Sequence, residues 1–197
     1  SEPAMRDVIR YYTREAGVRS FERELANLTR KAVKDILLKK YESIRITRRN
    51  LDTYAGIRRY RHGEIDHGDS VGITNGLAYT DTGGDLLVIE TVSMPGKGKI
   101  IPTGKLGEVM QESVQASWSY VRSRAVDFGI KPPLFSKRDV HVHVPEGAVP
   151  KDGPSAGIAI TTSIVSVLTG NPVKSSVAMT GEVSLRGRVL PIGGLKE

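Results

Sequence analysis

The stretch PKDGPSAGIAITTSI, residues 150–164, decides how its part of the chain folds. Gly153 and Pro154 predict a sharp turn, because glycine reaches backbone angles closed to other residues and proline fixes its own φ. The apolar run that follows predicts a buried helix over 155–169, which a Gly-Asn-Pro sequence ends. Ser155 is therefore expected at the very start of a buried helix.

Two interpretations of Ser155 follow from this position. Serine is common in the first turn of a helix, where its hydroxyl caps backbone N–H groups. A nucleophile is the alternative, because the first N–H groups of a helix lack intrahelical acceptors and can stabilise an oxyanion. Ala156 and Gly157 are small, so a substrate backbone can approach closely. The residues of this stretch alone leave both interpretations open.

Strands and helices are mixed around this stretch. A long helix is predicted over 107–128, where glycine and then proline stop it. Strands are predicted over 71–80, 85–94, 140–144, 177–182 and 188–190. Because adjacent strands form hairpins and helices intervene, the pattern predicts an α+β or mixed α/β fold.

The first 60 residues are predicted to form a small all-α subdomain. Shorter helices are predicted over 5–15 and 47–54. Between them, apolar residues at three- and four-residue steps put a stripe on one helix face: Phe21, Leu25, Leu28, Ala32, Ile36 and Leu37. A polar segment without periodicity, to about residue 69, is the predicted linker to a second domain over 70–197.

The positive charge of the chain is concentrated in its first third. Residues 1–61 hold 16 Lys and Arg against 8 Asp and Glu, whereas the whole chain has a net charge of +7. Such a patch can meet phosphates, so nucleic-acid binding stays open. The acidic residues among the bases, and the lack of interleaved aromatic residues, favour a solvated helix face equally well.

Composition and motif spacing exclude several kinds of site. The chain has no cysteine, which excludes disulfides, thiol catalysis and cysteine-based zinc sites. No apolar run is long enough to span a bilayer. Gly98 and Gly104 are separated by five residues, and Leu106 follows Lys105, so the Walker A pattern for ATP phosphates is not met.

Two histidines raise the question of a metal. His141 and His143 alternate along a predicted strand, so their side chains point to the same face. A catalytic zinc needs three protein ligands, and two are too few. We therefore predict no metal site.

The string HVHVPEGAVPKDGPSAG, residues 141–157, closely resembles the active-site segment of the Lon proteases, in the form typical of the A-type branch. The resemblance continues through residues 168–197 and through several shorter stretches between 76 and 113. Residues 11–23, YYTREAGVRSFER, resemble the small helical subdomain of the Lon AAA+ ATPase module. Since the chain does not begin with Met, we expect a C-terminal fragment of a longer protein.

The resemblance implies an ATP-dependent serine endopeptidase that degrades misfolded and regulatory proteins as a homo-hexamer. ATP and magnesium would be its cofactors in the full-length protein, and this fragment's own motifs bind neither. Ser155 matches the nucleophile of a Ser-Lys dyad. The family's lysine follows the text GGLKE, one residue after Glu197, so this chain alone is expected to be inactive.

Two lysines inside the chain are weaker candidates for the base. If a helix begins near residue 193, residues two apart point about 200° apart, so Lys196 should face away from Ser155. Lys151 lies beside the serine but matches a family position that is not the base.

Further residues are assigned through the same resemblance. Thr180 matches the position that hydrogen-bonds the catalytic lysine, and Arg19 matches the sensor-2 arginine that reads nucleotide phosphate. Asp152 precedes the serine in a segment whose backbone adopts active and inactive forms in the family. Three more residues match family positions near the site, namely Glu90, His141 and His143.

The resemblance also gives an expected cellular compartment and an alternative function. A bacterial cytoplasm is the expected compartment, with the mitochondrial matrix as the alternative, and no membrane partner is expected. The alternative function is a Lon-like fold used without catalysis, as an assembly or DNA-binding module, which the basic first third suits.

Overall fold

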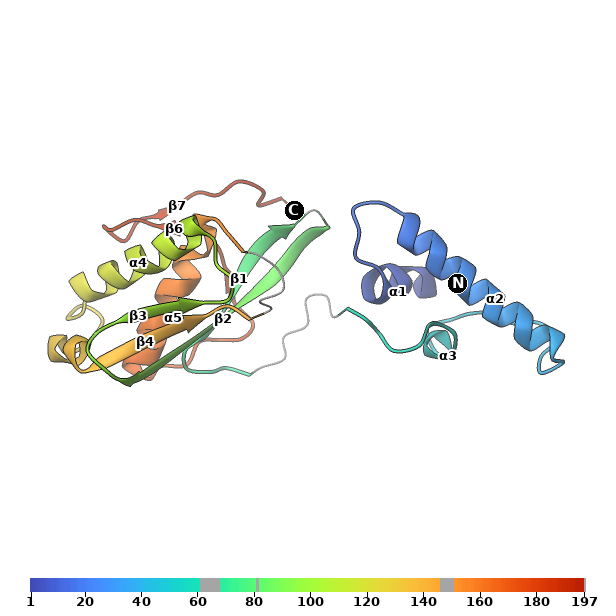
Figure 1. The fold of residues 1–197 in the computed structure, drawn as a ribbon, viewed down its shortest axis with the longest axis horizontal. Helices are drawn as coiled ribbons and strands as arrows, with labels where there is room; N and C mark the ends of the chain where they lie inside the picture. Colours follow the sequence, from blue (N-terminus) through green and yellow to red (C-terminus); the bar gives the residue numbers. More distant parts are fainter. Residues whose placement is uncertain (61–67, 81, 146–150, 197) are drawn as a thin grey trace. The chain divides into compact units, whose positions relative to one another are not determined.

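A computed structural model describes residues 1–60, 68–80, 82–145 and 151–196. The chain divides into two compact units, residues 1–64 with 80–83 and residues 65–79 with 84–197. Unit 1 is helical, whereas unit 2 contains the sheet and further helices (Figure 1). Residues 61–67 of the predicted linker lie outside the described part.

Unit 1 is helical, as the apolar periodicity predicted. Its helices are α1 (Glu2–Tyr12), α2 (Arg19–Leu37) and α3 (Leu51–Ala55). Leu28 of the predicted stripe is buried, and Phe21, Leu25 and Ala32 pack against the same cluster. The C-terminal end of the stripe is different, because Leu37 is 76% exposed. Only the first two thirds of α2 therefore contribute to the core of unit 1.

Tyr12 connects the end of α1 to α3 and to the residue that follows α3. The Tyr12 hydroxyl lies 2.9 Å from Asp52 Oδ1 and 2.8 Å from the Gly56 carbonyl oxygen. Burial, followed by the hydrogen bond to Asp52, raises the pKa of Tyr12 to about 12. The ammonium of Lys31 donates to the Tyr54 carbonyl at 2.6 Å and caps the end of α3.

Unit 2 is built on a five-stranded sheet in the order β3-β4-β2-β1-β5. Its strands are β1 (Ile73–Thr80), β2 (Gly83–Pro95), β3 (Ile100–Thr103), β4 (Arg138–His143) and β5 (Ala178–Met179). β2 and β4 are antiparallel, whereas β3 runs parallel to β4 and β5 parallel to β1. A separate antiparallel pair joins β6 (Glu182–Val183) and β7 (Val189–Leu190). The predicted mixed α/β class is confirmed.

The helices α4 (Glu108–Ser123) and α5 (Gly157–Thr169) pack on each other and on one face of this sheet (Figure 1). Side chains alternate along a strand, so Val140 and Val142 face the helices and are fully buried. Ile89 of β2 joins them, and Ile160 and Ile164 contribute from α5. The predicted buried helix therefore forms one wall of the core.

Several element predictions were wrong in detail, and the bounds of the helices predicted over 5–15 and 47–54 are among them. The strand β3 was not predicted, because GKGKIIPTGK contains more turn residues than strand residues. The helix predicted over 107–128 ends at Ser123, and residues 124–128 form turns. The strand predicted over 177–182 is two short strands, β5 and β6, interrupted where Gly181 takes φ +150°.

Candidate functional site

Ser155 lies in a short 3-10 turn, Pro154–Ala156, and α5 begins directly after it at Gly157. The sequence produces this turn because Gly153 takes φ +109°, which L side chains rarely adopt, and Pro154 cannot donate a backbone hydrogen bond. The serine is therefore two residues before the α-helix that was predicted to contain it.

The backbone that follows the Ser155 side chain is held by the segment after β5. Gly181 N donates to the Ser155 carbonyl at 2.6 Å, and Thr180 Oγ1 donates to the same oxygen at 3.2 Å. In return, Ile158 N donates to the Gly181 carbonyl at 3.0 Å. Thr180 thus lies beside the serine, but the contact it makes in this structure is to the backbone of Ser155.

Gly157 allows this close approach. A Cβ atom at Gly157 would lie 2.7 Å from Val183 N and 3.2 Å from both Gly181 O and Ser113 Oγ. Its carbonyl accepts a hydrogen bond from Ser117 Oγ at 3.3 Å, which connects the start of α5 to α4. Gly181 was not singled out from the sequence, although a glycine between two short strands is a signal of a close backbone approach.

Asp152 holds the segment before the serine against α4. Its Oδ1 accepts from Met110 N at 3.0 Å and from Gly153 N at 2.8 Å. Met110 is the third residue of α4, so the carboxylate caps that helix from a distant part of the sequence. Gly107 N also donates to the Lys151 carbonyl at 2.7 Å. The turn of Ser155 is consequently anchored to α4 on both of its sides.

The amides at the start of α5 are less free than the sequence suggested. Gly157 N donates to the Pro154 carbonyl, and Ile158 N donates to Gly181. The expectation of a fully open helix start, with its N–H groups free for an oxyanion, is therefore wrong for these two amides. The 3-10 turn supplies the acceptor for Gly157 N, and the segment after β5 supplies the acceptor for Ile158 N.

The side-chain hydroxyl of Ser155, unlike its backbone, is not held by hydrogen bonds among the described residues. The serine is half-buried, and within residues 151–196 and the other described ranges nothing hydrogen-bonds its Oγ. Lys196 is exposed and lies in a turn, so the helix assumed near residue 193 is not observed there. Lys151 is half-buried and bonds through its backbone to the segment before α4. Neither lysine serves as a hydrogen-bonded base in the described part of the chain.

The two histidines form their own cluster. Thr103 Oγ1 lies 2.8 Å from His141 Nε2 and 2.7 Å from His143 Nδ1, on the side of the sheet that Val140 and Val142 do not face. Glu90 pairs with His143 across β2 and β4, and its side chain is exposed. Thr103 was missed from the sequence because its strand, β3, was not predicted.

Arg19 is the first residue of α2 and is exposed. The first amides of this helix, Ser20 N and Phe21 N, already donate to the Glu15 carboxylate at 2.9 Å each. These bonds lower the pKa of Glu15. A cation at a helix N-terminus is unfavourable for the helix dipole, so helix stability does not account for Arg19.

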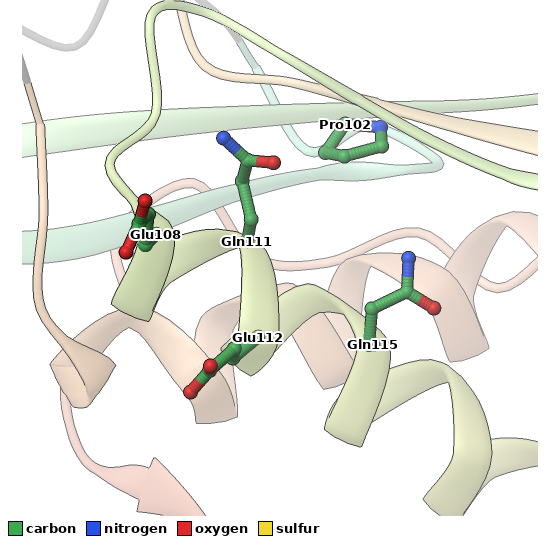
Figure 2. Close-up of a pocket in the computed structure, with 5 residues that line it drawn as sticks. All are labelled: Pro102, Glu108, Gln111, Glu112 and Gln115. Carbon is green, nitrogen blue, oxygen red and sulfur yellow. The ribbon is translucent and has the colours of Figure 1, made fainter.

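A hollow of about 380 Å³ lies between the outer face of α4 and β3 (Figure 2). Figure 2 shows Glu108, Gln111, Glu112 and Gln115 projecting from α4, with Pro102 opposite. None of the predicted site residues lines it.

Across the described ranges, no three His, Cys, Asp or Glu side chains gather so as to hold a metal ion. No helix among the same residues has the length and apolar character needed to cross a bilayer.

Comparison with known proteins matches the whole chain. Residues 45–197 match the family model of the Lon protease (S16) C-terminal proteolytic domain, and residues 1–44 match that of the Lon protease AAA+ ATPase lid domain. A Lon protease of Azospirillum brasilense is 69% identical over 199 residues, and one of Brucella suis biovar 1 is 66% identical over 197. A Lon protease of Vibrio parahaemolyticus is 60% identical over 197 residues. All of this chain is covered in each case, against 25%, 24% and 25% of the relatives.

The matches define a class of protein in which an AAA+ ATPase lid precedes a proteolytic domain. The chain belongs to the Lon protease family. It spans about a quarter of the length of the curated relatives it matches. The resemblance inferred from the motif around Ser155 is confirmed, whereas the assigned roles of individual residues and the boundary near residues 60–69 stay predictions.

Proposed function

We propose that this chain carries the lid and the serine nucleophile of an ATP-dependent endopeptidase that hydrolyses unfolded or regulatory proteins in quality control and stress response. One observation carries the proposal: the turn of Ser155 is bonded to its surroundings, while its Oγ has no hydrogen-bond partner in the described ranges. A nucleophile needs a fixed backbone and a hydroxyl that is free for its base and substrate.

The base in this proposal is the lysine that the family places directly after Glu197. Its neutral amine takes the proton of Ser155 Oγ, and the oxygen attacks the carbonyl carbon of the scissile peptide bond. The ammonium then gives the proton to the leaving amine, and water hydrolyses the acyl-enzyme. Because the amine must be neutral, the lysine requires a pKa lowered by burial. Thr180, which lies beside Ser155, is the proposed hydrogen-bond partner of this amine.

ATP and magnesium are the proposed cofactors of the longer protein. When bound, they would supply the free energy for unfolding substrates. Within this chain, Arg19 is the residue that fits such a role, because it is exposed at the start of α2 and the nearest helix amides are occupied by Glu15. Its guanidinium would contact a nucleotide phosphate as a sensor-2 arginine.

Assembly and location follow from the same family. We propose a homo-hexamer that acts on protein substrates in the cytoplasm, which the bacterial relatives support, with the mitochondrial matrix as the alternative. Several basic residues of unit 1 are engaged in ion pairs, among them Arg48 with Asp7 and Arg59 with Glu24. Such pairs weaken the alternative of a nucleic-acid surface, because paired charges attract phosphates less.

The test is peptide hydrolysis by a protein that continues past Glu197. Ser155→Ala should remove cleavage of a fluorogenic peptide and labelling by a fluorophosphonate. Ser123→Ala is the matched control, because the hydroxyl of this exposed serine donates to the Tyr120 carbonyl of its own helix and its loss should leave both signals intact. Equal cleavage with and without Ser155 would refute the nucleophile, whereas a parent protein that neither cleaves the peptide nor takes the label would favour the non-catalytic assembly or DNA-binding module.

A further inference from the structure

The β6–β7 hairpin is too short to hold its own position in unit 2. β6 and β7 have two residues each, and together they form a two-stranded sheet. Within the turn between them, Ser184 N donates to the Arg188 carbonyl at 3.0 Å and Gly187 N donates to the Ser184 carbonyl at 2.8 Å. A two-stranded hairpin by itself is marginally stable in water, so its position depends on what it packs against.

Gly181, directly before β6, joins the hairpin to the serine turn. Its N–H donates to the Ser155 carbonyl at 2.6 Å. A Cβ atom at Gly181 would overlap Val189 Cγ1, so β7 lies directly against this glycine. β6 is close to the start of α5 as well, because a Cβ at Gly157 would lie 2.7 Å from Val183 N. In such close packing the hairpin cannot shift without moving the backbone of Ser155.

The turn of the hairpin lies against Tyr120 of α4. A Cβ atom at Gly187 would overlap Cε2, Cζ and Oη of Tyr120, and the φ of +79° at Gly187 also favours glycine. Phe128 contacts the same ring edge to face, with the two ring centres 5.9 Å apart. Tyr120 follows Ser117 by three residues, so it shares the face of α4 on which Ser117 bonds the Gly157 carbonyl. One face of α4 thus contacts both the start of α5 and the hairpin, and β6 lies beside α4 in Figure 1.

We propose that Tyr120 is a positioning residue for Ser155: its ring fixes the β6–β7 hairpin, and the hairpin fixes Thr180 and Gly181 against the serine backbone. Thr180 Oγ1 and Gly181 N both donate to the Ser155 carbonyl. Tyr120 therefore acts through the hairpin rather than on the reacting atoms. The inference rests on the proposed function, because it takes Ser155 as the nucleophile and the lysine after Glu197, with Thr180 as its partner, as the base.

The test uses the protein that continues past Glu197 and makes two measurements. The first is the rate constant for labelling of Ser155 by a fluorophosphonate, and the second is the pH dependence of kcat/KM for cleavage of a fluorogenic peptide. Tyr120→Ala should slow the labelling roughly tenfold, because a reacting group misplaced by about 1 Å can lower the rate by about 10².

The same variant should move the acid limb of the pH profile upward by roughly half a pH unit or more. A loosened hairpin gives water access to the lysine amine, whose pKa then rises towards its ordinary value. The neutral amine that the reaction needs is therefore formed only at higher pH. Tyr120→Phe keeps the ring against Gly187 and should stay within about twofold of the parent protein in labelling, with the limb unmoved.

Gly187→Ala approaches the same contact from the hairpin side. Its methyl group would overlap the ring of Tyr120, so this variant should reproduce both the slow labelling and the shifted limb. The double variant Tyr120→Ala with Gly187→Ala should be no slower than the slower single variant, because both changes break one contact. Gly170→Ala is the matched control: Gly170 has a similar φ of +75°, but its Cβ would meet nothing within 4 Å, so neither measurement should change.

Parent-like labelling in both Tyr120→Ala and Gly187→Ala, or an equal fall in Gly170→Ala, would overturn the inference. Slower labelling with an unmoved limb would overturn it too, because a loss of folded protein lowers the rate without changing the pKa of the base. Gly187→Ala leaves the contact of Tyr120 with Phe128 in place, so it decides the question if Tyr120→Ala does not fold. Failure of the proposed function looks different: Ser155→Ala would then keep both the label and the cleavage.

Discussion

Gly157 shows at the scale of one residue how tightly the serine turn is packed. An alanine there would place its methyl group 2.7 Å from Val183 N, a distance that real Cβ atoms essentially never show. Because backbone atoms cannot yield as a flexible side chain does, Gly157→Ala should destabilise unit 2 by about 1–3 kcal/mol. Urea unfolding measures this loss.

The control for this prediction is Gly193→Ala. A Cβ at Gly193 meets nothing within 4 Å, so the free energy of unfolding should change by less than about 0.5 kcal/mol. Equal stability of the Gly157→Ala variant and the parent protein would show that β6 moves aside at little cost.

The sequence predicted the position of some residues of the site but not the contacts of others. Ser155 was placed at a turn before a helix because Gly153 and Pro154 act locally, and the turn is observed. The cap that Asp152 provides was not predicted, since its partner Met110 is 42 residues away in the chain. Local rules give no information about a contact of that separation.

At the scale of elements, α4 depends on a carboxylate from another segment. Its first turn carries no side-chain cap of its own, and Asp152 supplies one through Met110 N. Asp152→Ala should raise amide exchange in the first turn of α4 and lower stability by about 1 kcal/mol, the usual cost of a lost cap. Hydrogen exchange followed by mass spectrometry measures the first effect.

Asp152→Asn is the matched variant for this prediction. Its amide oxygen can still accept from Met110 N, so exchange in α4 should stay close to that of the parent protein. If both variants exchange equally fast, the charge of the carboxylate rather than its hydrogen bond stabilises α4.

At the scale of the whole molecule, the described residues form two hydrophobic cores that share no residue. One surrounds Val8 and Tyr12 in unit 1, and the other surrounds Val140 and Ile160 in unit 2. Val8→Ala should cost about 2 kcal/mol and raise amide exchange in unit 1 alone, whereas Val140→Ala should do so in unit 2 alone. Faster exchange throughout both units in either variant would show that they unfold together.

The order of the strands in the sheet could not be predicted from the sequence. Periodicity indicated most strands and the mixed class, because each signal is local. The parallel pairs β1–β5 and β3–β4 join segments far apart in the chain, with Asn75 facing Ala178. Single-sequence patterns do not encode such pairings, and the position of Thr180 beside Ser155 depends on one of them.

The edge strand β3 is protected against pairing with a strand of another molecule. Val140 N donates to the Lys99 carbonyl and Val144 N to the Thr103 carbonyl, so the odd-numbered carbonyls of β3 face β4. Pro102 therefore faces outward, where an ordinary residue would offer a free N–H to a passing strand. Since proline has none, this edge resists the strand-to-strand addition that starts aggregation, and no hydrogen bond of the sheet is lost.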